Sequence, residues 1–248
     1  MVEASMTGGH MFDHVRRALL LIGAALSATT GLYADTAAGL QAFRKADYTV
    51  AYREWKAAAD QGQAEAQYNL GMLYLKGLGV PAHPEEAFRW LRSAAEQGQA
   101  DAQFQVGLMR EKGIGVPQDY GQAQVWFALA AARGDAGAEV AMAELYEQGY
   151  GVQKDLARAV NWYQLAAEQG HSQAEYRLGS CYAAGKGIGK DPLKAYFWLT
   201  LASKQSNKDA QKQRSELTAR LSADDIAKTD LAIAEWKPNT VRAQNPNR

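Results

Sequence analysis

Residues 64–98 read AEAQYNLGMLYLKGLGVPAHPEEAFRWLRSAAEQG, and the same pattern starts again at residues 100, 136 and 172. A shift of 36 residues superimposes four sets of identical residues, which chance would not produce: Gly77, Gly113, Gly149 and Gly185; Gly79, Gly115, Gly151 and Gly187; Ala87, Ala123, Ala159 and Ala195; and Trp90, Trp126, Trp162 and Trp198. A fixed period of this length is typical of solenoids, in which each unit buries its apolar face only against its neighbours. This stretch therefore decides the fold.

Each unit is predicted to contain two helices. In the second half of the unit, Ala87, Trp90, Leu91 and Ala94 follow the spacing of a helix with one apolar face. The first half, residues 64–76, also places its apolar residues on one stripe, and these are Ala66, Leu70, Leu73 and Tyr74. Gly71 in this half stands where two helix backbones would need to approach closely.

The link between the two helices contains residues that favour the end of one helix and the start of the next. It reads Gly-x-Gly-Val or Gly-x-Gly-Ile, and in three units an aspartate follows at Asp119, Asp155 or Asp191. The first glycine suits the left-handed residue that ends a helix, and the aspartate suits the cap of the next one. Pro84 and Pro192 stand at the first helical position, where proline is tolerated best.

This pattern resembles the SEL-one-like repeat, a class of tetratricopeptide-like helix-pair solenoid. The resemblance is carried by A-E-A-Q-Y-N-L-G-x-L-Y-x-x-G-x-G-V at residues 64–80, by A-x-x-W-x-x-x-A-A-E-Q-G at residues 87–98, and by their three copies. It covers about residues 47–206, with departures at Arg110 and Ala143. It implies an adaptor or scaffold that binds other proteins and carries no catalytic residues.

The chain is therefore expected to be an all-α, α/α superhelical solenoid of 36-residue helix pairs with a cap at each end. The expected segments are a signal peptide (1–34), a degenerate N-terminal capping repeat (35–62), four repeats (63–99, 100–135, 136–171 and 172–206), C-terminal capping helices (207–238) and a disordered tail (239–248). In the cap, Ala210, Leu217 and Leu221 share one side of a polar helix. A second helix, begun by Ser222, is expected to close the array with Ile226, Ala227, Leu231 and Ala234.

The first 34 residues differ from the rest of the chain. Arg16 and Arg17 precede an apolar run over residues 18–28, which is too short to span a bilayer, and small residues follow. This order is typical of a secretory signal, cleaved after Ser27, Ala28 or Ala34, and the start of translation could be Met6 or Met11. The alternatives are a poorly translated N-terminal extension and a signal anchor that stays attached. With cleavage, we expect a periplasmic or secreted protein that is not inserted in the membrane.

Composition and single residues exclude several kinds of function. The chain has 27 Lys and Arg and 27 Asp and Glu residues without a basic stripe, so no nucleic-acid partner is expected. Cys181 is the only cysteine, which excludes an internal disulfide, and its apolar neighbours in the other repeats predict a core residue. The tryptophans are likewise interpreted as core residues, with a carbohydrate-stacking platform as the alternative.

Motifs for catalysis or ligand binding are missing from the mature region. The Gly-x-Gly turns follow no strand and have no P-loop lysine, so phosphate binding is not expected. The four histidines lack metal-ligand spacing, and Ser-x-x-Lys, Gly-x-Ser-x-Gly and His-Glu-x-x-His are absent after the signal. We therefore predict no enzyme, no catalytic, cofactor-binding or metal-binding residues, and a monomer.

Comparison of the four copies locates a candidate partner site. Positions that stay constant serve the packing that the copies share, whereas varying positions are free to serve recognition or to be merely solvated. Three varying positions form one strip on each first helix; they are Asn69, Gln105, Ala141 and Arg177; Met72, Leu108, Glu144 and Ser180; and Lys76, Lys112, Gln148 and Ala184. The predicted partner-binding residues are Asn69, Met72, Lys76, Gln105, Leu108, Lys112, Glu144 and Arg177.

The strip is apolar and basic in the first two repeats and more acidic around Glu144 and Glu147. In helix-pair solenoids, first helices usually line the concave face, so the leading hypothesis is a non-enzymatic scaffold of the cell envelope that binds a partner protein or peptide there. An acidic and apolar end of that partner is expected over the first two repeats. The alternatives are a cell-wall or β-lactam hydrolase and a glycan- or peptidoglycan-binding module.

Overall fold

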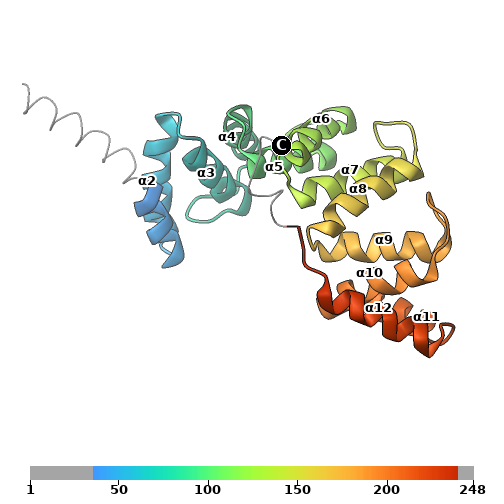
Figure 1. Ribbon diagram of the computed structural model, residues 1–248. Helices are drawn as coiled ribbons and strands as arrows, with labels where there is room; N and C mark the ends of the chain where they lie inside the picture. The colour runs from blue at the N-terminus through green and yellow to red at the C-terminus, as the bar shows by residue number, and fades with distance from the viewer. Residues whose placement is uncertain (1–35, 240–248) are drawn as a thin grey trace, which may run out of the picture. The chain divides into compact units, whose positions relative to one another are not determined.

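A computed structural model describes residues 36–239, which are entirely helical, with no strand in that range (Figure 1). A helix over residues 36–44 comes first. The labelled helices are α2 (Tyr48–Asp60), α3 (Ala64–Lys76), α4 (Pro84–Glu96), α5 (Ala100–Lys112), α6 (Tyr120–Ala132), α7 (Ala136–Gln148), α8 (Leu156–Glu168), α9 (Ser172–Ala184), α10 (Pro192–Lys204), α11 (Lys208–Thr218) and α12 (Ala223–Glu235). Among the described residues, α2 packs against α3, and each helix from α4 to α10 packs against the next one, which confirms the predicted helix-pair solenoid. The predicted signal peptide and most of the predicted tail lie outside the described residues.

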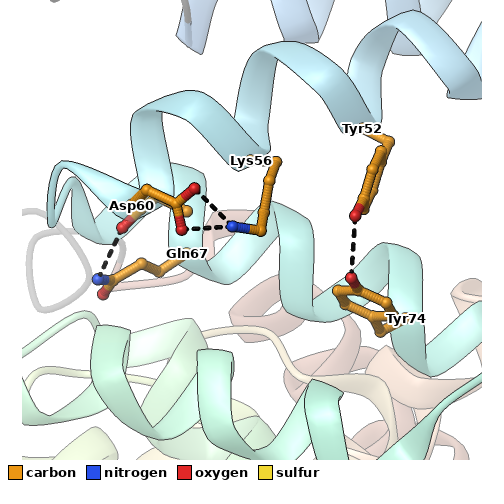
Figure 2. A network of polar contacts seen from close by, with 6 residues as sticks. Tyr52, Lys56, Asp60, Gln67 and Tyr74 are labelled. Atoms are coloured by element: carbon orange, nitrogen blue, oxygen red, sulfur yellow. Dashed lines mark hydrogen bonds and ion pairs between the residues drawn. The ribbon is translucent and has the colours of Figure 1, made fainter.

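The chain divides into two compact units, Met1–His83 and Pro84–Arg248. In the first unit, Trp55 of α2 is only 2% exposed, and its indole donates a hydrogen bond to the Thr36 carbonyl. Figure 2 shows two further contacts of α2: an ion pair between Lys56 and Asp60, and a 3.1 Å contact between the hydroxyls of Tyr52 and Tyr74 that joins α2 to α3. The degenerate repeat thus keeps contacts to the helices on either side of α2.

In the second unit, the turns use the predicted residues. Gly113, Gly149 and Gly185 end α5, α7 and α9 in the left-handed conformation, with φ between 68° and 81°. The Asp155 carboxylate accepts a hydrogen bond from the Arg158 amide at the start of α8, and Asp119 and Asp191 cap α6 and α10 in the same way. The glycine that ends a first helix and the aspartate that starts a second one therefore fix where the chain turns.

The glycine that recurs within the first helices leaves space for a side chain of the second helix rather than for its backbone. A Cβ atom added at Gly107 would lie 2.5 Å from the ring of Phe127 in α6, and one added at Gly179 would lie 2.7 Å from Leu199 in α10. The third repeat has Ala143 at this position, fully buried, and the partner there is Tyr163. The close contact between the two helices of a pair was predicted, but its partner is the large residue next to the tryptophan.

The interpretation of the tryptophans as core residues is only partly right. Trp90, Trp126, Trp162 and Trp198 are half-buried. The fully buried position is the next one along the chain, and it holds Leu91, Phe127, Tyr163 and Leu199. One residue is a turn of about 100° on a helix, which moves the tryptophan to the edge of the apolar face. Trp55, which comes one position late in the degenerate repeat, occupies the buried position.

The C-terminal cap forms with a different face than expected. Ser222 caps α12 as predicted, and Ala210 and Leu217 of α11 pack against Leu199 and its neighbours. On α12, however, Ile233 is the buried residue, with Ile226 and Trp236 beside it, whereas Leu231 is 68% exposed. Ala227 and Ala234 are also exposed. The larger side chains Ile233 and Trp236 bury more apolar surface, which outweighs the alanine-rich stripe.

Candidate functional site

The predicted partner-binding strip lies on the exposed side of the first helices. In the first unit, Asn69 and Met72 of α3 are half-buried and Lys76 is exposed. In the second unit, the strip runs over α5, α7 and α9. The last strip residue of each helix is exposed, namely Lys112, Gln148 and Ala184. The other strip residues are half-buried, except Ala141, which is buried. Leu108 packs against the core cluster around Phe127, so it serves the packing as well as the surface.

Charged side chains connect the strip from one helix to the next in the second unit. Arg177 of α9 lies 4.0 Å from the carboxylate of Glu144 on α7. Burial raises the pKa of Glu144 although Arg177 lowers it, and the charge of Lys112 on α5 also favours the carboxylate. Lys112, Glu144 and Arg177, predicted from three separate repeats, therefore form one electrostatic series.

Glu147 is the centre of the polar contacts beside this strip. The Tyr163 hydroxyl donates to Glu147 Oε2 at 2.8 Å, and the Lys186 ammonium donates to Oε1 at 2.5 Å. Burial alone would raise the pKa of Glu147, but these hydrogen bonds hold it below the ordinary value. Burial and the neighbouring carboxylate raise the pKa of Tyr163, which keeps its proton. The acidic end predicted from Glu144 and Glu147 is thus largely neutralised within the chain.

Two neighbouring cavities lie where the strip reaches the C-terminal cap. One, of about 230 Å³, is lined by Glu147, Tyr163, Tyr176, Arg177, Ser180, Cys181, Ala184, Lys186 and Gln213. The other, of about 380 Å³, is lined by Ser180, Ala183, Ala184, Lys190, Pro192, Gln213, Glu216, Leu217, Arg220 and Leu221. Ser180 donates a hydrogen bond to Gln213 of α11 at 2.8 Å, and this pair belongs to both cavities. Arg177 Nε is buried there without a hydrogen-bond partner.

Several of these residues were not predicted, and two of them could have been. Tyr163 brings a hydroxyl to a position that is Leu91, Phe127 and Leu199 in the other repeats, so it needed a polar partner. Lys186 is the only charged residue between the paired glycines of a turn. Gln213, in contrast, belongs to α11, which lies outside the repeat period and therefore has no equivalent to compare.

The thiol of Cys181, which lies in this region, is not activated as a nucleophile. Cys181 is 8% exposed, and burial raises the pKa of its thiol, which disfavours the nucleophilic thiolate. Within residues 36–239, no group of three or more His, Cys, Asp or Glu side chains is placed to hold a metal ion. No helix in the same range is both long and apolar enough to cross a bilayer.

Comparison with known families agrees with the period and with the helix pairs. The family model of the Sel1 repeat matches residues 64–99, 100–135, 136–171 and 172–207, which together make up more than half of the chain. The chain belongs to the Sel1 repeat family. Proteins built from Sel1 repeats are generally scaffolds for protein interactions and are typically not enzymes.

Two solved structures of Sel1-type proteins are similar to this one. A Sel1 repeat protein from Oxalobacter formigenes is 40% identical, with a TM-score of 0.64, over 67% of this chain and 66% of that one. A protective antigen of uropathogenic Escherichia coli with an SLR fold is 28% identical, with a TM-score of 0.75, over 88% of this chain but only 46% of that one. This Sel1 chain thus spans less than two thirds of either relative. No match to a curated protein was found.

Proposed function

We propose that this Sel1 repeat protein is a non-enzymatic, monomeric scaffold of the cell envelope that binds an extended segment of a partner protein along the first-helix strip. The observation that carries the proposal is the pair of cavities around Ser180 and Gln213, at the C-terminal end of the strip. Binding sites are typically concave and combine apolar walls with a few polar groups that fix orientation. Leu217 and Leu221 supply apolar walls here, and Gln213 supplies polar groups.

The charges of the strip support a polar and not strongly charged partner segment at this end. Glu147 is already bonded to Lys186, and Glu144 lies near Arg177, so neither carboxylate is left as a free anion for a basic partner. The basic residue Lys112, which is exposed on α5, favours an acidic side chain of the partner farther along the strip. The segment would thus be acidic toward α5 and neutral at the cavities.

Ala184 offers a test that does not disturb the core. It is exposed at the end of α9 and lines both cavities, so Ala184→Trp should fill them and leave the melting temperature unchanged. Ala223→Trp is the matched control, because Ala223 is exposed at the start of α12 and lines neither cavity. Acidic substitution of Leu108 would be less informative, since Leu108 also packs against the core.

Wild-type protein and both variants are used as bait in quantitative affinity capture from envelope extract. A partner that binds wild type and Ala223→Trp but not Ala184→Trp supports the proposal. Equal capture by all three baits would place the partner elsewhere, and the absence of any saturable partner would refute a scaffold role.

The envelope location rests on the N-terminal pattern of Arg16 and Arg17 followed by an apolar run. Cell fractionation and mass spectrometry of the N-terminus test it. A mature chain that begins after Ser27, Ala28 or Ala34 in the envelope fraction supports it, and an intact chain confined to the cytoplasm would overturn it.

A further inference from the structure

The outer side of α6 presents a second surface, separate from the first-helix strip. Val125 is 51% exposed and Leu129 is 43% exposed, although both are large apolar residues. They are one helical turn apart and therefore adjacent on the helix surface. The half-buried Trp126 comes directly after Val125. These three residues form what we call the α6 outer face.

The equivalent residues of the other repeats show that this surface is unusual. They are Arg89, Trp90 and Ser93 in the first repeat, Asn161, Trp162 and Leu165 in the third, and Phe197, Trp198 and Leu201 in the fourth. Only the second and fourth repeats are apolar at all three positions. The polar residues of the first repeat show that the solenoid itself does not need an apolar outer face.

In the fourth repeat, this apolar triplet is covered by a helix of the same chain. Leu201 is only 6% exposed and packs with Ile233 of α12, which is 4% exposed. The Trp236 ring lies edge-on to Phe197 and to Trp198, with ring centroids 6.5 and 6.1 Å away. Ile233 and Trp236 are three residues apart, so one face of a helix and its C-terminal extension are sufficient to cover the triplet.

The surroundings of the α6 outer face are suited to the same kind of partner. No residue of α6, Tyr120–Ala132, carries a charge, so α6 itself offers no ionised group that a docked helix would desolvate. In the fourth repeat, the Tyr196 hydroxyl donates to Asp230 of α12 at 3.1 Å. The half-buried Gln124 occupies the equivalent position of α6, where its amide also has a donor to offer.

We propose that the α6 outer face is the docking site of an amphipathic helix from a partner protein, which packs on Val125, Trp126 and Leu129 as α12 packs on α10. The occupant presents two large apolar side chains three residues apart, like Ile233 and Trp236, and few charges on that face. A helix laid on an apolar surface with anchors at this spacing is a recurring mode of recognition. A second copy of the chain is a poorer occupant, because a stable dimer buries roughly 1,200 Å² or more, far more than two exposed side chains offer, whereas a docked helix can bind weakly over a smaller area.

The test uses the full chain and a synthetic peptide with the sequence of residues 222–239, which includes Ile233 and Trp236. The indole N–H signals of the tryptophans are followed by NMR, a measurement that detects weak binding and reports its location. The expected result is a saturable shift of the Trp126 signal, with those of Trp90 and Trp162 unchanged. Because an isolated peptide of this length is only partly helical, we expect weak binding.

Two double variants show whether the shift comes from the α6 outer face. Val125→Glu with Leu129→Glu should weaken peptide binding by about tenfold or more, because charges would be buried against apolar side chains. Arg89→Glu with Ser93→Glu places the same charges at the equivalent positions of the first repeat and should leave binding unchanged. All substituted residues are exposed or half-buried, and melting curves of the variants verify that they fold.

Three results would overturn the proposal. The first is no shift of Trp126 at millimolar peptide. The second is a shift of Trp198 and Trp236 instead, which would mean that the peptide only replaces α12 on α10. The third is self-association of the wild-type chain, measured by sedimentation, that Val125→Glu with Leu129→Glu abolishes, because the face would then be covered by a second copy.

Discussion

Replacing Glu175 by glutamine should stabilise the protein, and the gain should grow as pH rises. Glu175 lies on α9 and is 0% exposed, and its Oε2 accepts a hydrogen bond from the Gln205 amide at 2.9 Å. Burial raises the pKa of this carboxyl to about 7, which the bond from Gln205 only partly offsets. The native state therefore holds a proton that the unfolded chain releases at lower pH.

The size of the effect follows from the two pKa values. The unfolded carboxyl titrates near 4.5 and the folded one near about 7. Below the lower pKa the carboxyl is protonated in both the folded and the unfolded state, so the pKa difference does not lower the free energy of unfolding. Between the two values the unfolded state binds fewer protons, so the free energy of unfolding falls by about 1.4 kcal/mol per pH unit. Above the upper value the loss is complete and amounts to about 3 kcal/mol.

Glutamine avoids this cost, and the chain already shows how it fits. Gln67 and Gln103 occupy the equivalent position in the first two repeats. Each donates from Nε2 to a backbone carbonyl eight residues earlier, at 3.3 and 3.1 Å. In Glu175→Gln the equivalent acceptor is the Ala167 carbonyl, so the new amide has a partner.

Urea unfolding of wild type and Glu175→Gln, followed by circular dichroism at pH 5 and pH 8, measures the difference. We expect the variant's advantage in unfolding free energy to increase by about 2 kcal/mol between the two pH values. Glu216→Gln, at an exposed position of α11, is the control and should show no such increase. An advantage that is the same at both pH values, or a variant less stable at pH 8, would refute the reasoning.

Two further predictions concern the core of the second unit. Gly107→Ala should destabilise the chain by about 1–3 kcal/mol, because the added Cβ would meet the Phe127 ring and force it to move. Thermal melting measures this loss of stability, and an unchanged melting temperature would contradict the close contact. Tyr163→Phe should also lower the unfolding free energy, by about 1–3 kcal/mol, because it leaves Glu147 one donor short. An equal loss when Tyr163→Phe is made in a Glu147→Gln background would show that the hydrogen bond to the carboxylate is not its cause.

The repeat period predicted most of the fold because the residues that end and begin the helices recur in each unit. The glycine that must adopt a left-handed conformation and the aspartate that must cap a helix depend on neighbours a few residues away, so they can be read locally. The cap could not be read in this way. On α12, Leu231 and Ile233 are both apolar. Which of the two is buried depends on the shape of α10, and the sequence of α12 does not indicate that shape.

The candidate site was predictable where it follows the period. Glu144 and Arg177 were chosen from separate repeats because both positions vary, and the structure places them 4.0 Å apart. The cavities were not predictable, because they need α11 and because Lys186 reaches Glu147 across 39 residues of sequence.

The change from glutamine to glutamate along the array has a consequence for the coupling between repeats. Gln103 reaches back to Ala95 in the preceding repeat and so joins two neighbours with a buried hydrogen bond. Glu175 as a carboxylate has no proton to donate and instead accepts from Gln205 at the end of its own repeat. In a solenoid, the contacts between neighbours decide how far unfolding in one repeat spreads to the next. The Glu175→Gln variant should therefore not only be more stable above pH 7 but also unfold with a steeper dependence on urea, since the fourth repeat would be joined more firmly to the third.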